Sequence, residues 1–374
     1  MPKNEPFWNP YRWVQLSDSP IQYAAPHYHH RLSGSSGRIW CDLEALTPLI
    51  IGDGRSGEVN FVRRAFDQMP YIPSTSLKGA IRSLAELIGN AAVPIHRSKV
   101  DDQHQVQMGA RGSDSGWKLD IAARMFGFLN RGDVFAGLVQ FSDGSLTDRS
   151  QDWRLWPTFK VAGGQPDPDH RPFYPDRKRR KLYHHQVNAV GLTPPHAGIR
   201  EDQKRTIRPA PPGTRFTFQV DFANLRDEEL NLLLYCLVLE ERVEVTLSKL
   251  ALGPSATAPI TVTGPLRHKL GGCKPQGGGS VCFRVLKLLV RDDPTARYRG
   301  GSDPGVMEGE PLRRELERRT EALRTRRDDT MQQLRAMLIY AENDPRVKNM
   351  NYPSYQWFQD DKVTGSGMPL KPTT

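Results

Sequence analysis

The sequence has little cysteine and no long apolar run. Its four cysteines are widely spaced and none forms a C-x-x-C pair, so we expect reduced thiols rather than a structural zinc site or a disulfide framework. No apolar run is long enough to cross a membrane, and the first residues lack the apolar core of a signal peptide. We therefore expect a soluble, cytoplasmic protein that does not contact a membrane.

Metal-ligand patterns are also scarce. His27, His29 and His30 lie close together, but no cysteine or further histidine accompanies them at ligand spacing. We therefore expect no bound metal and no other cofactor.

The charge that the sequence has in excess is positive. Lys and Arg number 52 against 42 Asp and Glu, which gives a formal net charge of +10 at pH 7. Lys and Arg side chains gain free energy by releasing counterions from phosphates, so nucleic acid is the leading class of partner. With 374 residues, the chain can form one domain with large insertions or two domains.

The stretch from Met69 to Gly89 predicts a proline-containing turn that runs into a helix. Apolar residues recur at helical spacing and predict one buried face: Leu77, Ile81, Leu84 and Ile88. The sequence offers three hydroxyl residues as N-cap candidates, Ser74, Thr75 and Ser76, and Gly89 as the C-terminal stop.

Two cations follow in this helix. Lys78 lies in the first turn, where the helix dipole is positive, and Arg82 lies four residues later on the same flank. With the free amides of the first turn they would form a phosphate cradle. The alternative is an amphipathic surface helix whose Lys and Arg are solvated.

A glycine-rich segment spans residues 269–284, and its glycines lie ahead of a predicted strand from Val281 to Val290. Its glycines would let the main chain approach a ligand, with Lys269, Lys274 and backbone amides offered to phosphates. It is not a Walker A loop, because no Gly-Lys-Ser/Thr triplet ends it and a strand follows. The alternative is a structural hairpin.

The most basic part of the chain is a predicted insertion over about residues 150–212. Its centre, Arg171–His185, mixes Lys and Arg with aromatic residues. The cations can neutralise phosphates while Tyr174, Tyr183 and His184 stack on bases, as in proteins that bind single-stranded RNA. The alternative is a solvated basic loop.

Two strand–helix units predict the fold. The first joins an alternating strand at residues 39–45 to the helix after the proline turn. The second joins a strand with Phe216, Phe218, Val220 and Phe222 on one face to a helix that we expect Asn224 to cap. That helix has a predicted buried stripe of Leu230, Leu233, Leu234 and Leu237. The repetition favours an α+β, ferredoxin-like β-α-β-β-α-β plan.

A second glycine pattern, residues 52–57, matches G-x-G-x-x-G. A dinucleotide fingerprint opens a helix directly, whereas the residues from Val59 onward are extended in character. A kinase would also need V-A-I-K, H-R-D and D-F-G motifs, which the sequence lacks. We interpret these glycines as a turn rather than a nucleotide site.

Several of these motifs resemble one family. Residues 70–83 resemble the P-x-I-P-G-S-S-L-K-G-x-x-R-S signature of the RAMP superfamily, with Ser74 in place of the usual glycine. Residues 269–281 resemble the K-x-G-x-G-K-P-x-G-x-G-S-V loop of the same proteins. Residues 121–127 and 137–143 resemble two shorter elements of the superfamily, and residues 180–185 resemble an R-K-x-Y-x-H element of its type III-D branch.

The resemblance covers most of residues 38–290 and implies a ferredoxin-like (RRM-like) core with thumb and lid insertions. We expect an N-terminal arm over residues 1–37, the core over 38–290 with insertions at about 90–120 and 150–212, and a linker, charged helix and tail over 291–374. The charged helix is predicted from Leu312 to Glu342.

The resemblance also implies a function in antiviral defence. It points to a backbone subunit of a CRISPR effector complex, of type III-D or the related type VII, that binds the guide RNA (crRNA) and presents it to complementary target RNA. Copies would stack in a filament beside other effector subunits and, in one alternative, a separate nuclease. The residues implied in RNA binding are Arg63, Arg64, Ser76, Lys78, Gly79, Arg82, Lys178, Arg179, Arg180, Lys181, Tyr183, His184, Lys269, Gly271, Gly272, Lys274, Gly277, Gly278 and Gly279.

Cleavage is a separate question. Target-cleaving relatives carry an aspartate in the loop before the proline turn, and the matching place here falls near Asn60, an amide that is neither a base nor a strong metal ligand. We expect a backbone subunit that does not cleave. Two alternatives stay open: a Mg²⁺-dependent endoribonuclease using Asp53, Glu58 or Asp67, and a standalone RNA-binding or RNA-processing protein.

Overall fold

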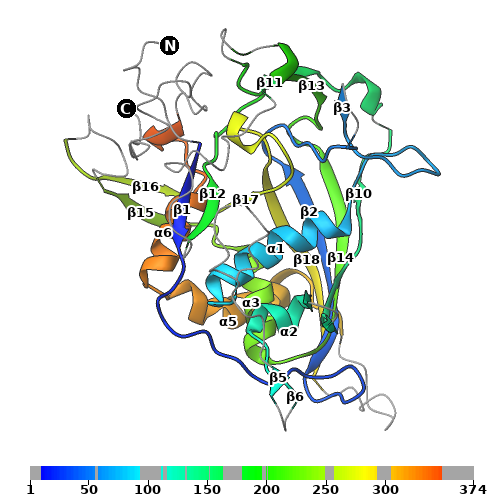
Figure 1. The fold of residues 1–374 in the computed structure, drawn as a ribbon, viewed down its shortest axis with the longest axis vertical. Coiled ribbons are helices and arrows are strands. Elements are labelled where there is room, and N and C mark those ends of the chain that lie inside the picture. The colour runs from blue at the N-terminus through cyan, green and yellow to red at the C-terminus, as the bar shows by residue number, and fades with distance from the viewer. Residues whose placement is uncertain are drawn as a thin grey trace.

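The computed structural model describes residues 10–54, 58–92, 111–112, 116–130, 133–150, 152–162, 179–195, 199, 201–248, 257–292 and 305–347. A seven-stranded sheet forms its centre (Figure 1). Strand β2 (Ser35–Ala45) lies between β14 (Arg215–Leu225) and β18 (Ser280–Arg291), and both pairings are antiparallel. Shorter strands extend the two edges: β17 (His268–Lys269) beside β18, and β9 (Val139–Phe141), β10 (Gly144–Leu146) and β4 (Tyr71–Ile72) beyond β14.

Helices cover one face of this sheet (Figure 1). They are α1 (Ser74–Ile88), α2 (Ile121–Phe126) and α3 (Asp227–Val238), with α5 (Gly309–Arg324) packed against α3. Along the chain the core elements follow as β2, α1, β9, β14, α3 and β18, and in space the strands lie in the order β18, β2, β14, β9. This is the ferredoxin-like plan, so the predicted fold class is confirmed.

The predicted buried stripes meet between the sheet and the helices. On β14, Phe216, Phe218, Val220 and Phe222 are at most 3% exposed, and the four leucines predicted on α3 are fully buried. Burying each such side chain contributes roughly 1.5–3 kcal/mol relative to leaving it in water. The alternation of the strand and the 3.6-residue period of the helix therefore specify the same core.

The start of α1 differs from its prediction. Pro73 is the N-cap residue and makes no side-chain capping hydrogen bond, so the prediction of a Ser or Thr cap is wrong. The amide of Ser74, the first helical residue, instead donates to Asp143 Oδ1 at 2.7 Å. A carboxylate from the neighbouring chain segment thus takes the place that the helix dipole favours for an anion. The helix ends before Gly89, as predicted.

Asn224 also differs from its prediction, because it does not cap α3. The N-cap residue is Arg226, whose amide donates to Glu229. Asn224 lies in β14 at a φ of 62°, and its side-chain oxygen accepts from the amides of Ser33 and Gly34. It therefore ties the segment before β2 to the sheet.

The N-terminal segment packs on its own chain as far as it is described. Strand β1 (Tyr11–Gln15) pairs antiparallel with β12 (Arg179–Tyr183) of the basic insertion. Its Tyr11 and Val14 are buried, and it contacts helix α6 (Asp329–Leu338). This pairing fixes the basic strand β12 on the body of the protein.

The basic insertion forms a second small sheet at the end of the molecule away from β5 and β6 (Figure 1). Strand β13 (Lys204–Arg208) pairs with β11 (Phe159–Ala162) and, in parallel, with β3 (Val59–Asn60). Two single-turn 3₁₀ helices accompany it, η2 (Trp153–Leu155) and η4 (Glu201–Gln203). The loop before the proline turn and the insertion are thus one structural unit.

The single C-terminal helix predicted over residues 312–342 is wrong, because the segment forms two helices, α5 and α6. Asp328 caps α6 by accepting from the amide of Met331. Arg335 of α6 reaches back and donates to the carbonyls of Arg324 and Arg326, which lie at and beyond the end of α5. These side chains satisfy the backbone groups that a break in the helix exposes.

The remaining described elements are short. They comprise the hairpins β5 (Arg111–Gly112) with β6 (Gly116–Trp117), β7 (Gly127–Asn130) with β8 (Asp133–Ala136), and β15 (Val243–Leu247) with β16 (Ile260–Gly264), and the 3₁₀ turns η5 (Lys274–Gln276) and η7 (Pro345–Val347). No described helix is both long and apolar enough to span a bilayer.

Candidate nucleic-acid interface

A hollow of about 340 Å³ forms where three predicted RNA-binding segments meet. One wall is the N-terminal half of α1, another is β12, and the third is the glycine loop, by which we mean residues 270–279 between β17 and β18. The polar residues that line it are Thr75, Ser76, Ser83, Lys181, Tyr183, His268, Lys269 and Lys274. The fold therefore brings together motifs that lie about 190 residues apart in the sequence.

The hollow is positively charged. Lys181, Lys269 and Lys274 line it, and no carboxylate does so among the described residues. Burial lowers the pKa of Lys181 to about 8. Burial, and then the charge of Lys274, lowers the pKa of Lys269 to about 7, while burial and Arg180 lower the pKa of Lys274. Because crowding and burial disfavour the charged lysines, an anion bound between them would stabilise them.

Aromatic rings hold two of these lysines in place. Lys181 Nζ lies 3.7 Å from the ring centroid of Tyr11 and 5.2 Å from that of Tyr183. Lys274 Nζ lies 6.0 Å from the same Tyr183 ring. Cation–π contacts of this kind position a cation without neutralising it.

Backbone hydrogen bonds hold the glycine loop, both within the loop and to the segment at Pro48 and Ile50. The amides of Gly272, Gly278 and Gly279 donate to carbonyls of Ile50, Cys273 and Pro48, at 2.8–3.0 Å, and the amide of Gly277 donates to Lys274. These four amides are thus already used inside the chain. Lys269 Nζ likewise donates to the carbonyl of Gly278 at 2.9 Å.

Close packing explains why two positions of the loop are glycine. A Cβ atom on Gly271 would lie 2.2 Å from the carbonyl oxygen of Ile50, and one on Gly279 would lie 2.1 Å from that of Leu270. Both residues have positive φ, near 73° and 78°. The loop therefore acts as a rigid support that presents the side chain of Lys274.

The predicted residues of α1 divide into two groups. Ser76 and Gly79 line the hollow. Lys78 lies on the neighbouring flank, half-buried, with a pKa lowered by burial and by Arg82. Arg82 itself donates to Glu86 at 2.7 Å and to the carbonyl of Gly127 at 2.8 Å, so it stabilises the packing of α1.

The predicted residues of β12 divide in the same way. Lys181 and Tyr183 line the hollow, whereas Arg180 donates to the buried carboxylate of Glu86. Arg179 is exposed at the start of the strand. His184 is 3% exposed and has no face open to a base, so the expected stacking role does not fit its position. Lys178 and Tyr174 lie outside the described residues.

The sequence analysis did not single out every residue of the hollow. His268 lines it, stacks on Phe283 with ring centroids 4.4 Å apart, and has Nε2 2.7 Å from the carbonyl oxygen of Cys236. Burial lowers its pKa to about 4, so it is neutral at physiological pH. In the sequence, the position of His268 directly before Lys269 is the feature that could have indicated its place in the hollow.

The three candidate acids lie elsewhere, in and around the loop before the proline turn. Glu58 pairs with Arg208 at 3.0 Å, and Asp67 pairs with Arg149 at 2.9 Å. Asp53 is half-buried, and its amide donates to the carbonyl of Asn60. The described part of the chain holds no group of three or more His, Cys, Asp or Glu residues that could bind a metal.

Two arginines predicted to bind RNA, Arg63 and Arg64, also lie in the loop before the proline turn. Arg63 lies over the ring of Trp153, and Arg64 lies over the ring of Phe66.

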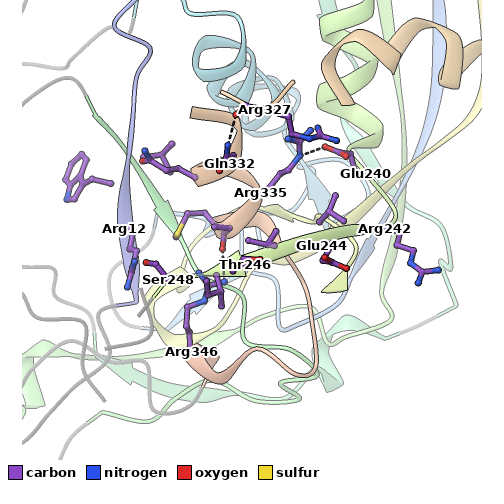
Figure 2. A pocket seen from close by; sticks show the side chains of 18 residues that line it. Arg12, Glu240, Arg242, Glu244, Thr246, Ser248, Arg327, Gln332, Arg335 and Arg346 are labelled. Carbon is purple, nitrogen blue, oxygen red and sulfur yellow. Dashed lines mark hydrogen bonds and ion pairs between the residues drawn. The ribbon is translucent and has the colours of Figure 1, made fainter. Parts of the chain in front are cut away.

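A larger cavity, about 750 Å³, lies between β1, β15 and α6 (Figure 2). Its labelled side chains include five arginines, of which Arg335 is paired with Glu240 at 2.8 Å. None of the residues predicted to bind RNA lines it. We therefore place the candidate site at the smaller hollow, where the predicted residues converge.

Comparison with known proteins agrees with the resemblance. The family model of the RAMP superfamily matches residues 42–248, more than half of the chain. No curated protein matches the sequence. The superfamily comprises CRISPR-associated RNA-binding proteins, which supports RNA binding and a place in a CRISPR complex in general terms. The chain belongs to the RAMP superfamily.

Proposed function

We propose that this protein is a guide-RNA-binding backbone subunit of a multi-subunit CRISPR effector complex. Copies stack along the guide RNA and present its bases to complementary target RNA. Other effector subunits complete the assembly. The type III-D or type VII assignment rests on the resemblance of residues 180–185, four of which belong to β12.

The observation that carries this proposal is the composition of the hollow. Three lysines with lowered pKa values line it together with Tyr183 and the hydroxyls of α1, and no described carboxylate does. Phosphate is the anion that RNA supplies at regular spacing, and lysine ammonium groups bind it as point charges. Within the hollow we assign phosphate contacts to Ser76, Lys181 and Lys274, with Gly79 allowing the backbone of the RNA to come close. We assign a further phosphate contact to Lys78, on the neighbouring flank of α1.

We propose further that the protein does not itself cleave target RNA. The ion pairs of Glu58 with Arg208 and of Asp67 with Arg149 support this, because a carboxylate already paired with an arginine is less available to hold a metal ion. The competing hypothesis is a Mg²⁺-dependent endoribonuclease that uses Asp53, Glu58 or Asp67.

One assembly experiment tests both parts. The full-length protein is mixed with a guide RNA, labelled complementary RNA and Mg²⁺, and both filament formation and cleavage are followed. We expect filaments that bind the complementary strand tightly and leave it intact. Regularly spaced cuts that disappear in Asp53→Ala, Glu58→Ala or Asp67→Ala would show that the subunit is a nuclease. Failure to form filaments on RNA would favour a standalone RNA-binding protein.

A further inference from the structure

A second group of aromatic and arginine side chains lies outside the hollow. It consists of Arg63, Arg64 and Phe66 in the loop before the proline turn and of Trp153 and Arg154 in η2, and we call it the arginine–aromatic surface. Phe66 is 82% exposed. Leu155, which follows Arg154 in η2, is exposed to the same extent.

The exposure of Phe66 does not arise from a loose loop. The amide of Arg64 donates to Met69 at 3.0 Å, and the amide of Gln68 donates back to Arg64 at 3.0 Å. The side chain of Asp67 accepts from the amide of Met69 and pairs with Arg149. Hydrogen bonds on both sides of the turn therefore hold the ring of Phe66 in the solvent.

Arginines flank both aromatic rings. The guanidinium carbon of Arg64 lies 5.5 Å from the ring centroid of Phe66. Those of Arg63 and Arg154 lie 4.4 and 5.4 Å from the ring of Trp153. Flat apolar faces bordered by guanidinium groups suit an unpaired nucleobase with its phosphates, because bases stack on rings while arginines attract the backbone.

We propose that the arginine–aromatic surface is a second RNA contact, in which an unpaired base stacks on Phe66 while neighbouring phosphates bind Arg63 and Arg64. The inference rests on the proposed function, since it assumes that RNA occupies the hollow. The loop continues through β4 directly into α1, so one RNA strand that leaves the hollow at Ser76 can follow this part of the chain.

Base stacking can be measured directly. RNA oligonucleotides carrying 2-aminopurine at successive positions are bound to the full-length protein, and the fluorescence at each position is compared with that of free RNA. We expect one position, or a regular set of positions, to be quenched by wild-type protein. Phe66→Ala should abolish that quenching and weaken binding by about 5- to 150-fold. Phe66→Trp should preserve both.

A matched control is Leu129→Ala, which removes an apolar side chain that is 70% exposed on β7, outside both surfaces. It should leave quenching and affinity unchanged. Phe66→Ala protein that binds RNA with wild-type affinity and the wild-type quenching pattern overturns the inference while leaving the proposed function standing. Phe66→Ala protein that keeps its RNA contacts but no longer forms filaments would make this surface an interface between protein subunits, which also overturns it. Wild-type protein that binds no RNA contradicts the proposed function itself.

Discussion

Arg180 of strand β12 donates a hydrogen bond to the buried carboxylate of Glu86 in helix α1. The same carboxylate accepts from Arg82 one turn earlier in the helix. Glu86 is 2% exposed at its side chain, so it is a buried anion shared by two cations. This contact joins the basic insertion to the helix of the first motif, and both elements line the hollow.

Replacing Glu86 should therefore destabilise the fold. We expect Glu86→Gln to lower the free energy of unfolding by about 2–3 kcal/mol, because both arginines lose a partner and each is only about a fifth exposed. Urea denaturation measures the change. Since Glu86 and Arg180 are in contact, Glu86→Gln combined with Arg180→Met should cost less than the sum of the two single changes. Additive effects would contradict a direct interaction.

Lys274 provides the test of the hollow as a phosphate site. We expect Lys274→Ala to weaken binding of single-stranded RNA by about tenfold, the effect of losing one charge-assisted hydrogen bond. The slope of log affinity against log salt concentration should fall by about 0.7, corresponding to one phosphate contact fewer. Lys287→Ala is the matched control, because Lys287 lies on β18 and pairs with Glu308. Equal losses from both variants would indicate a diffuse charge effect.

The lowered lysine pKa values predict a pH dependence. Lys269 and Lys181 have pKa values of about 7 and 8 in the free protein, so both lose their charge as the pH rises through that range. RNA binding should weaken as the pH rises from 7 to 9 and should take up protons, because bound phosphate raises the pKa of a nearby ammonium group. Calorimetry in buffers of different ionisation enthalpy measures the uptake.

Lys181→Arg supplies the control for this titration. A guanidinium group stays protonated throughout the range and can still stack on Tyr11, where Lys181 lies 3.7 Å from the ring centroid. The variant should take up fewer protons and lose less affinity between pH 7 and 9. An unchanged pH profile would show that Lys181 does not bind the RNA.

The sequence predicted the elements of the site better than the partners of their side chains. Lys78 and Arg82 share a flank of α1, which suggested one phosphate cradle, but Arg82 is held by Glu86 and Gly127. Which cation is paired depends on residues that the fold brings close, and local spacing does not specify them. The glycine loop shows the same limit, because glycine permits close approach equally to a ligand or to the protein's own carbonyls, as at Gly279.

Gly79 separates these two uses of glycine. It lies inside α1 and lines the hollow, and a Cβ atom there would meet no atom within 4 Å beyond its chain neighbours and the helix's own backbone. An internal helical glycine costs roughly 0.5–1 kcal/mol relative to alanine. We therefore expect Gly79→Ala to raise the free energy of unfolding by about that amount, as measured by urea denaturation.

If the backbone of the RNA packs against this position, the same methyl group should weaken RNA binding. Gly79→Ala would then be more stable and bind less tightly, whereas Gly279→Ala would be less stable, since its Cβ atom would lie 2.1 Å from a backbone oxygen. Opposite signs of the two stability changes would separate a glycine kept for the ligand from one kept for the fold. Wild-type RNA affinity in Gly79→Ala would show that no ligand atom comes within methyl distance of α1.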